Sequence, residues 1–231
     1  ASKAVRKQIM APAVTGTKAQ KSGAELPPQA RQMMMEAIGK VRAHVEENFD
    51  YVGDTFAREA RAIHEGKSEE RGIYGEATPT EVKAELVRRL VDAGLPIVEA
   101  TSFVHPRWVP QLADAAELLT ALGRTDLPVL VPNEHGLDRA LELGCQHIAI
   151  FGSATESFAQ RNLNRSLDEQ FAMFEPVVAR ARDAGLTVRA YVSMCFGDPW
   201  EGAVPVEQVV GVGKRLFDLG ASQLSLGDTI G

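Results

Sequence analysis

From Pro79 to the end of the chain, short apolar runs alternate with longer amphipathic stretches. The apolar runs are rich in Val, Ile and Phe and predict strands over 97–103, 128–133, 147–153, 186–193 and 223–229. The intervening stretches have helical spacing and predict helices over 79–93, 108–122, 137–143, 166–184 and 206–219. This alternation predicts an α/β fold with a parallel sheet, and both a doubly wound sheet and a (β/α)8 barrel fit it.

The first of these helices has a clear amphipathic pattern. Its predicted buried face carries Val82, Leu86, Leu90 and Ala93. Thr78 or Thr80 can cap its start, because a hydroxyl accepts a hydrogen bond from a free N–H of the first turn.

The chain before Pro79 has a different texture. Residues 1–30 are small and polar, interrupted by Pro and Gly, and predict a flexible arm. Residues 31–78 predict a helical extension, with helices over 31–47 and 54–65 and Asp54 as the N-cap of the second. The net charge changes at the same place, from +1 over residues 1–78 to −7 over residues 79–231. We therefore expect two regions of different origin.

Polar residues gather where the predicted strands end. They are Ser102, Asn133, Ser153, Ser193 and Asp228. Barrel enzymes place their chemistry at the carboxyl ends of their strands, so these positions are candidates for a site.

Glu99 and Asp228 are the two informative carboxylates. Glu99 lies inside a predicted apolar strand, and Asp228 lies at the end of another. A buried carboxylate costs several kcal/mol unless it is paired or hydrogen-bonded. On this reasoning alone, a structural pair with an arginine such as Arg189 and a functional role are equally supported.

Composition and charge exclude several classes of function. A net charge of −6 makes general nucleic-acid binding unfavourable, and no stretch is apolar for long enough to span a membrane. The two cysteines, Cys145 and Cys195, indicate a reducing compartment, so we expect a cytoplasmic protein. The five histidines are scattered without metal-ligand spacing, so the residues themselves indicate no metal site.

Several motifs over residues 79–231 resemble 3-hydroxy-3-methylglutaryl-CoA (HMG-CoA) lyase. They include EATSFV at 99–104, WVPQ at 108–111, IAIFGSATESFAQRNLNRS at 148–166, SMCFGDPWEG at 193–202 and LSLGDTIG at 224–231. Residues 5–80 resemble the C-terminal half of a family of short, uncharacterised bacterial proteins. The two resemblances meet at GEATPTEV, residues 75–82, so we expect a chimera or a truncated chain.

The lyase resemblance implies a TIM barrel that cleaves HMG-CoA to acetyl-CoA and acetoacetate with Mg²⁺ or Mn²⁺. By motif, it makes Glu99 and Asp228 the active-site carboxylates. It places Asn133, Ser193 and Thr229 at the mouth of the barrel, against an acyl-CoA substrate. The related citramalate- and homocitrate-type synthases remain an alternative, although they lack the WVPQ run.

The chain also departs from the family pattern. The Arg-Asp-Gly segment of the family's first strand and its His-x-His pair are absent, so we assign no metal ligand and expect impaired activity. Residues 79–231 correspond to strands two to six of a partial (β/α)8 barrel. The alternative is a non-catalytic interaction protein, because a partial barrel has two open edges through which the chain would form homo-oligomers.

Overall fold

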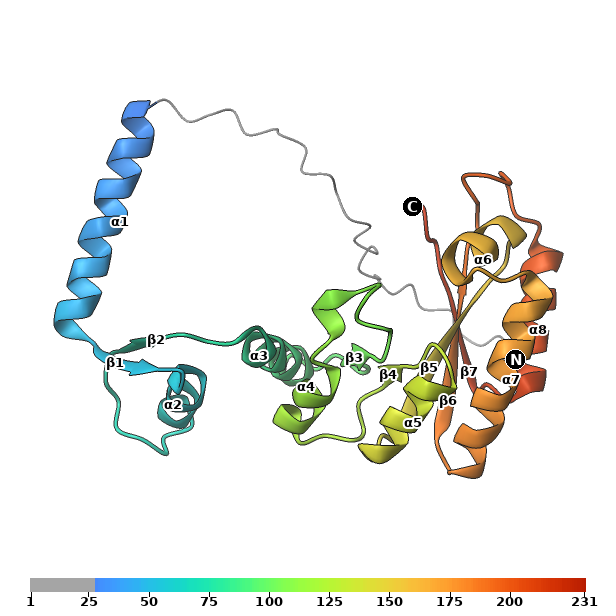
Figure 1. The fold of residues 1–231 in the computed structure, drawn as a ribbon, viewed down its shortest axis with the longest axis horizontal. Coiled ribbons are helices and arrows are strands. Elements are labelled where there is room, and N and C mark those ends of the chain that lie inside the picture. The colour runs from blue at the N-terminus through green and yellow to red at the C-terminus, as the bar shows by residue number, and fades with distance from the viewer. Residues whose placement is uncertain (1–27) are drawn as a thin grey trace. The chain divides into compact units, whose positions relative to one another are not determined.

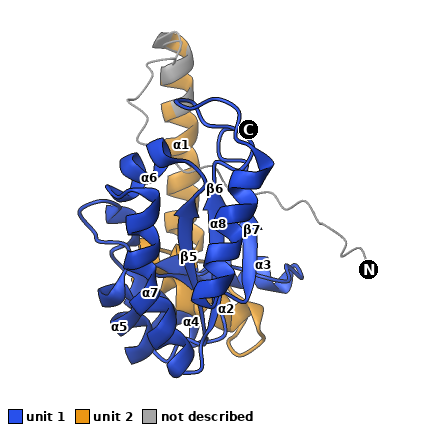
Figure 2. Cartoon of the chain, turned by 90° about the vertical axis from the view of Figure 1, so that its right-hand side faces the viewer, with its two compact units in different colours: residues 1–12, 84–231 blue, residues 13–83 orange. Residues whose placement is uncertain are grey.

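The computed structural model describes residues 28–231, so most of the predicted flexible arm lies outside the described residues. Contacts divide the chain into two compact units, with a boundary between residues 83 and 84 (Figure 2). This boundary falls inside helix α3 (Pro79–Asp92). The division at residue 78, which rests on sequence texture, stays a prediction.

The larger unit is built on one parallel five-stranded sheet, which confirms the predicted α/β fold. Its order is β3-β4-β5-β6-β7. The strands are β3 (Thr101–Ser102), β4 (Val129–Leu130), β5 (His147–Ser153), β6 (Thr187–Ser193) and β7 (Gln223–Leu226). They match the five predicted strands in number and order. Within residues 28–231 the sheet is open and does not close into a barrel.

Helices connect consecutive strands of this sheet (Figure 1). They are α4 (Ala115–Leu122), α5 (Glu134–Glu142), α6 (Glu156–Leu163), α7 (Leu167–Asp183) and α8 (Val206–Leu219). The long helices α7 and α8 lie side by side against the sheet. α7 buries Phe174 and Val177 completely, in one core with Ile150 of β5 and Ala190 of β6.

Local sequence signals account for the ends of these helices. Ser166 and Glu169 form a reciprocal capping box at the start of α7: the Glu169 N–H donates to Ser166 Oγ at 3.1 Å, and the Ser166 N–H donates to Glu169 Oε2 at 2.7 Å. Thr78 and Glu81 make the same pair of bonds at the start of α3, which selects Thr78 over Thr80 as the cap. Gly220 ends α8 with a φ of +117°, a conformation that glycine adopts most easily.

Two details of the helices predicted over residues 79–122 are wrong. The buried residues of α3 are Ala84 and Val87, whereas Val82 and Leu86 are each 57% exposed. The predicted helix over 108–122 is a turn, a 3₁₀ helix (Pro110–Leu112) and then α4, because the chain turns at 106–108 and Pro110 has no N–H to donate to a preceding turn.

The smaller unit contains the two predicted helices, α1 (Pro28–Asn48) and α2 (Phe56–His64). It also contains an unpredicted parallel pair of short strands, β1 (Asp50–Gly53) and β2 (Ile73–Gly75). Asp54 is not the N-cap of α2, because the helix begins one residue later and Thr55 occupies that position. The extension is therefore mainly helical, as predicted, but it is built around a two-stranded ribbon.

No helix in the described part of the chain is long and apolar enough to cross a membrane.

Candidate functional site

The candidate site lies on the face of the sheet opposite the helices. Along β6, the buried residues Val188, Ala190 and Val192 alternate with the less buried Arg189, Tyr191 and Ser193. Because side chains alternate between the two faces of a strand, Arg189, Tyr191 and Ser193 share the open face. In a closed barrel this face would point inward.

Glu99 contributes a carboxylate to this face. The Tyr191 hydroxyl donates a hydrogen bond to Glu99 Oε2 at 2.9 Å. Loss of solvent around the carboxylate raises the pKa of Glu99, although the Tyr191 bond and the positive charge of Arg189 partly oppose this. Burial, followed by the charge of Glu99, raises the pKa of Tyr191 to about 12. The three residues therefore form one coupled polar cluster.

The position of Glu99 corrects the sequence-based expectation. Glu99 precedes the two-residue strand β3 instead of lying within it, and the residue as a whole is exposed. The structural pair with Arg189, which the sequence supported equally with a functional role, is indirect. The Arg189 guanidinium donates twice to Gln223 Oε1, at 3.1 and 3.0 Å, and acts on Glu99 through its charge.

Asp228 and Thr229 follow β7, which ends at Leu226, whereas the predicted strand extended to residue 229. Asp228 is exposed. Thr229 Oγ1 accepts a hydrogen bond from the Met194 N–H at 2.8 Å. Met194 has a φ of +59°, which is uncommon outside glycine, so Thr229 helps to hold a strained turn after β6.

Asn133 and Ser193 have different local environments. Asn133 is the N-cap of α5, where its Oδ1 accepts from the Gly136 N–H at 3.0 Å. Ser193 ends β6 with a half-buried side chain, and its carbonyl accepts from the Ala154 N–H at 2.9 Å. The structure thus connects Ser193 to the loop after β5, whereas the side-chain oxygen of Asn133 is engaged by its own helix.

Asp198 is a structural centre that the sequence analysis did not identify. It is 3% exposed and accepts hydrogen bonds from Thr155 Oγ1 at 2.5 Å, the Trp200 N–H at 2.7 Å and the Glu201 N–H at 3.0 Å. Burial alone would raise the pKa of Asp198, but these hydrogen bonds and the charge of Arg161 together hold it below its usual value. The Gly-Asp-Pro run at 197–199 is a turn signal that pointed to this position.

The Asp198 turn connects the loops that follow β5 and β6. Glu201 Oε1 accepts from the Ser157 N–H at 2.6 Å, in the first turn of α6, where a negative charge is favourable. The Arg161 guanidinium lies over the Trp200 ring, 4.3 Å from its centroid. These contacts hold the loops after the neighbouring strands β5 and β6 together.

The donor set does not fit a divalent metal centre. Among residues 28–231, no three His, Cys, Asp or Glu side chains come close enough together to hold an ion. Mg²⁺ and Mn²⁺ prefer several oxygen ligands, so Glu99 and Asp228 do not suffice. We therefore derive no chemical step through a metal.

Comparison with protein families gives two matches. The model "Protein of unknown function (DUF1178)" matches residues 1–103, and the model "HMGL-like" matches residues 73–231. Both resemblances stated from the motifs are confirmed. The two matches overlap at 73–103, a range that includes the GEATPTEV segment.

Curated relatives match over most of the chain. "Hydroxymethylglutaryl-CoA lyase, mitochondrial" of Bos taurus is 43% identical over 182 residues, which are 77% of this chain and 55% of the relative. "3-hydroxy-3-methylglutaryl-CoA lyase, cytoplasmic" of Danio rerio is 47% identical over 159 residues, which are 68% of this chain and 48% of the relative. The chain thus spans about half the length of these relatives. Because they come from two compartments, the cytoplasmic location stays a prediction.

Solved structures show the same relationship. The hydroxymethylglutaryl-CoA lyase from Pseudomonas aeruginosa has a TM-score of 0.64 and 40% identity, covering 66% of this chain and 52% of that one. An HMG-CoA lyase from Acinetobacter baumannii, in complex with coenzyme A and 3-methylmalate, has a TM-score of 0.61 and 28% identity, covering 65% and 50%. The sheet β3–β7 is therefore part of a TIM-barrel fold. The chain belongs to the HMGL-like family.

Proposed function

We propose that the chain carries part of an HMG-CoA-lyase-type active site and that its 231 residues alone have impaired activity. The observation that carries this proposal is the match of the HMGL-like family model to residues 73–231, a range that contains the polar cluster of Glu99, Arg189 and Tyr191. The reaction would cleave HMG-CoA to acetyl-CoA and acetoacetate. The carbon–carbon lyase class comes from the family, and the exact substrate is part of the proposal.

The reaction needs proton transfer at two points. A base removes the proton of the tertiary hydroxyl, and the electrons of the breaking carbon–carbon bond form the enolate of acetyl-CoA. An acid then protonates that enolate. Relatives depend on a divalent metal, which would polarise the hydroxyl. We propose that Mg²⁺ or Mn²⁺ would need ligands other than Glu99 and Asp228.

The residues of this chain would bind and orient the substrate. In our proposal, Glu99 holds the Tyr191 hydroxyl on the open face, and Asp228 supplies a second carboxylate after β7. Ser193 and Thr229 border the same mouth, and Asn133 has amide protons to donate while its oxygen caps α5. A structure neighbour was solved with coenzyme A, which supports an acyl-CoA substrate for this chain.

The impaired activity is tested with the chain as it stands. With HMG-CoA and Mg²⁺ or Mn²⁺, we expect no acetoacetate above the protein-free control, since the described donor set does not form a metal site. Titration calorimetry should likewise show no micromolar affinity for Mn²⁺. Clear turnover by the 231-residue chain would overturn this part of the proposal.

The lyase assignment itself is tested by a segment exchange. Residues 84–231 would replace the matching segment of the Pseudomonas aeruginosa lyase. We expect the exchanged enzyme to cleave HMG-CoA, and Glu99→Gln to lower kcat/KM by about tenfold or more. Asp168→Asn is the control, because the Asp168 side chain is 87% exposed on α7 and forms an ion pair with the surface residue Arg215.

A folded but inactive exchange enzyme would contradict the lyase assignment. A panel with citramalate- and homocitrate-type substrates in the same assay separates the lyase from the related synthases. If the exchanged enzyme prefers one of those substrates, that substrate would replace HMG-CoA in the proposal.

A further inference from the structure

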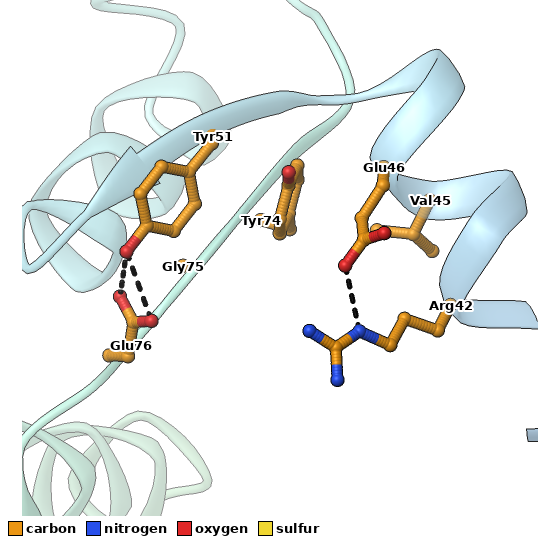
Figure 3. Close-up of a pocket in the computed structure, with 7 residues that line it drawn as sticks. All are labelled: Arg42, Val45, Glu46, Tyr51, Tyr74, Gly75 and Glu76. Carbon is orange, nitrogen blue, oxygen red and sulfur yellow. Dashed lines mark hydrogen bonds and ion pairs between the residues drawn. The ribbon is translucent and has the colours of Figure 1, made fainter. Parts of the chain in front are cut away.

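The smaller unit contains a cavity that the lyase chemistry does not use. It has a volume of about 520 Å³ and lies between the end of α1 and the ribbon formed by β1 and β2 (Figure 3). Its lining residues are Arg42, Val45, Glu46, Tyr51, Tyr74, Gly75 and Glu76. All of them belong to the unit that precedes the HMG-CoA-lyase-like sheet.

Two tyrosines form one wall of this cavity. Tyr51 and Tyr74 are register partners on the parallel ribbon, and their ring centroids are 5.2 Å apart. Tyr51 is 61% exposed, so solutes can reach the wall. The electron-rich face of a tyrosine ring attracts cations, and planar cations can also stack on it.

A carboxylate is held beside this aromatic wall. The Tyr51 hydroxyl lies 2.9 Å from Glu76 Oε2 and 3.1 Å from Oε1, so it donates to the carboxylate group and fixes its orientation (Figure 3). Each carboxylate oxygen can accept more than one hydrogen bond, so both retain free acceptor positions. The hydroxyl lies between the two oxygens, so the acceptor positions that remain on Glu76 are the outward-facing ones, next to two aromatic rings.

The charge of the lining favours a cation. Arg42 carries one positive charge, and Glu46 and Glu76 carry two negative charges, which leaves the lining with a net charge of −1. Arg42 Nε pairs with Glu46 Oε1 at 2.7 Å, but this is an exposed pair one helical turn apart, and such pairs contribute little. A ligand can displace it at small cost.

We propose that this cavity binds a guanidinium group, as found on arginine. A guanidinium is planar and positively charged, so it can stack on Tyr74 and donate an N–H bond to an outward-facing acceptor position of Glu76. An ammonium group has the same charge but lacks the plane that stacks on a ring. The site therefore distinguishes arginine from lysine.

Titration calorimetry with the full chain tests this proposal. The probes are L-arginine and N-acetyl-L-argininamide, whose comparison separates the free amino acid from an arginine within a peptide. N-acetyl-L-lysinamide and the neutral N-acetyl-L-citrullinamide are the matched controls. We expect the blocked arginine probe to bind at least about fivefold more tightly than either control.

Single substitutions test which side chains bind the arginine probe. Glu76→Gln should weaken binding of the arginine probe by about tenfold or more, because it removes the charge and one acceptor. Tyr74→Leu should weaken it severalfold through the loss of stacking. Glu69→Gln changes an exposed glutamate outside the cavity and should have no effect. Circular dichroism checks that each variant is folded.

Three results would overturn the proposal. They are the absence of measurable heat with either arginine probe, equal affinity for the lysine or citrulline probe, and undiminished affinity in a folded Glu76→Gln variant. None of them bears on the lyase assignment, because the cavity and the sheet β3–β7 share no residues.

Discussion

Asp198 shows how one buried charge organises two loops. Its carboxylate accepts one hydroxyl and two backbone N–H groups, and all three donors would lose their partner if it were removed. We expect Asp198→Ala to lower the free energy of unfolding by about 2 to 4 kcal/mol, and Asp198→Asn to cost less because an acceptor oxygen remains. Urea denaturation measures both. A loss no larger than that of the surface variant Asp168→Ala would contradict this role.

The same carboxylate should make stability depend on pH. The pKa of Asp198 is lower in the folded chain than in the unfolded chain, where it is about 3.9. Its contribution is therefore present above that unfolded value and is lost as the pH falls through the lower folded value. Asp198→Asn should remove this part of the acid dependence, which urea titrations between pH 2 and about pH 5 can detect.

Glu99 and Tyr191 predict a change that is visible by spectroscopy. The negative charge of Glu99 is one reason why the pKa of Tyr191 rises to about 12, with burial as the larger cause. Glu99→Gln should therefore lower the Tyr191 pKa part of the way toward about 10. Tyrosinate absorbance in an alkaline titration measures it, with Tyr191→Phe identifying the signal. An unchanged titration would mean that the Glu99–Tyr191 pair is absent in solution.

The shifted pKa of Glu99 makes the stability of the fold depend on pH in the opposite direction to that of Asp198. It is raised in the folded chain, so the contribution of Glu99 is fully present below its unfolded value of about 4.3 and declines as the pH rises through the folded value. Glu99→Gln stays neutral throughout. The free energy of unfolding of the Glu99→Gln variant should therefore depend less on pH between the unfolded and the folded pKa of Glu99.

At the scale of the element, α7 depends on its cap. The Ser166 hydroxyl and the Glu169 carboxylate each satisfy a backbone N–H at the start of a 17-residue helix that packs at the centre of the core. Ser166→Ala should lower the free energy of unfolding by about 0.5 to 2 kcal/mol, whereas Ser166→Thr keeps the hydroxyl and should cost little. Thermal unfolding followed by circular dichroism compares the two. Equal losses would exclude the capping bond as the cause.

The pattern of the sequence predicted the sheet well because buried parallel strands are continuous apolar runs. β5 is mostly apolar, and β6 carries Val188, Ala190 and Val192 on its buried face, and both strands form as predicted. The prediction failed where pattern and context conflict. β1 and β2 are only four and three residues long and each ends in glycine, so they are too short for a periodicity to reveal them. Val82 and Leu86 have helical spacing but do not face the core.

The candidate site was harder to predict than the fold. Motifs located Glu99, Asp228 and Thr229, but only the fold shows that Tyr191, 92 residues away from Glu99, is its hydrogen-bond partner. Asn133 shows the reverse difficulty, because its position at a strand end is also the N-cap of α5. A polar residue at such a junction serves the helix, the site or both, and sequence does not separate these roles.

At the scale of the whole molecule, the two edge strands should promote association. Among residues 28–231, β7 pairs only with β6 and β3 only with β4. Leu226 on β7 is 53% exposed. We expect the chain to self-associate with increasing concentration, and Leu226→Lys to shift it toward the monomer, because an edge lysine opposes strand pairing.

Light scattering after size-exclusion chromatography measures this association. Gln160→Lys adds the same charge on the exposed surface of α6, the helix that follows the central strand β5. Because this position is not on an edge strand, the substitution should leave the association unchanged. A monomer at all concentrations would show that the open edges do not recruit other chains.

The uneven length of the strands has a consequence for local opening. β5 and β6 are paired over seven residues and covered by α7, whereas β3 and β4 have two residues each. Backbone amides should therefore exchange their protons with deuterated water most slowly in β5 and β6 and fastest around β3. The carboxylate of Glu99, just before β3, would then stand on the most labile strand of the sheet, while its partner Tyr191 stands on one of the most protected.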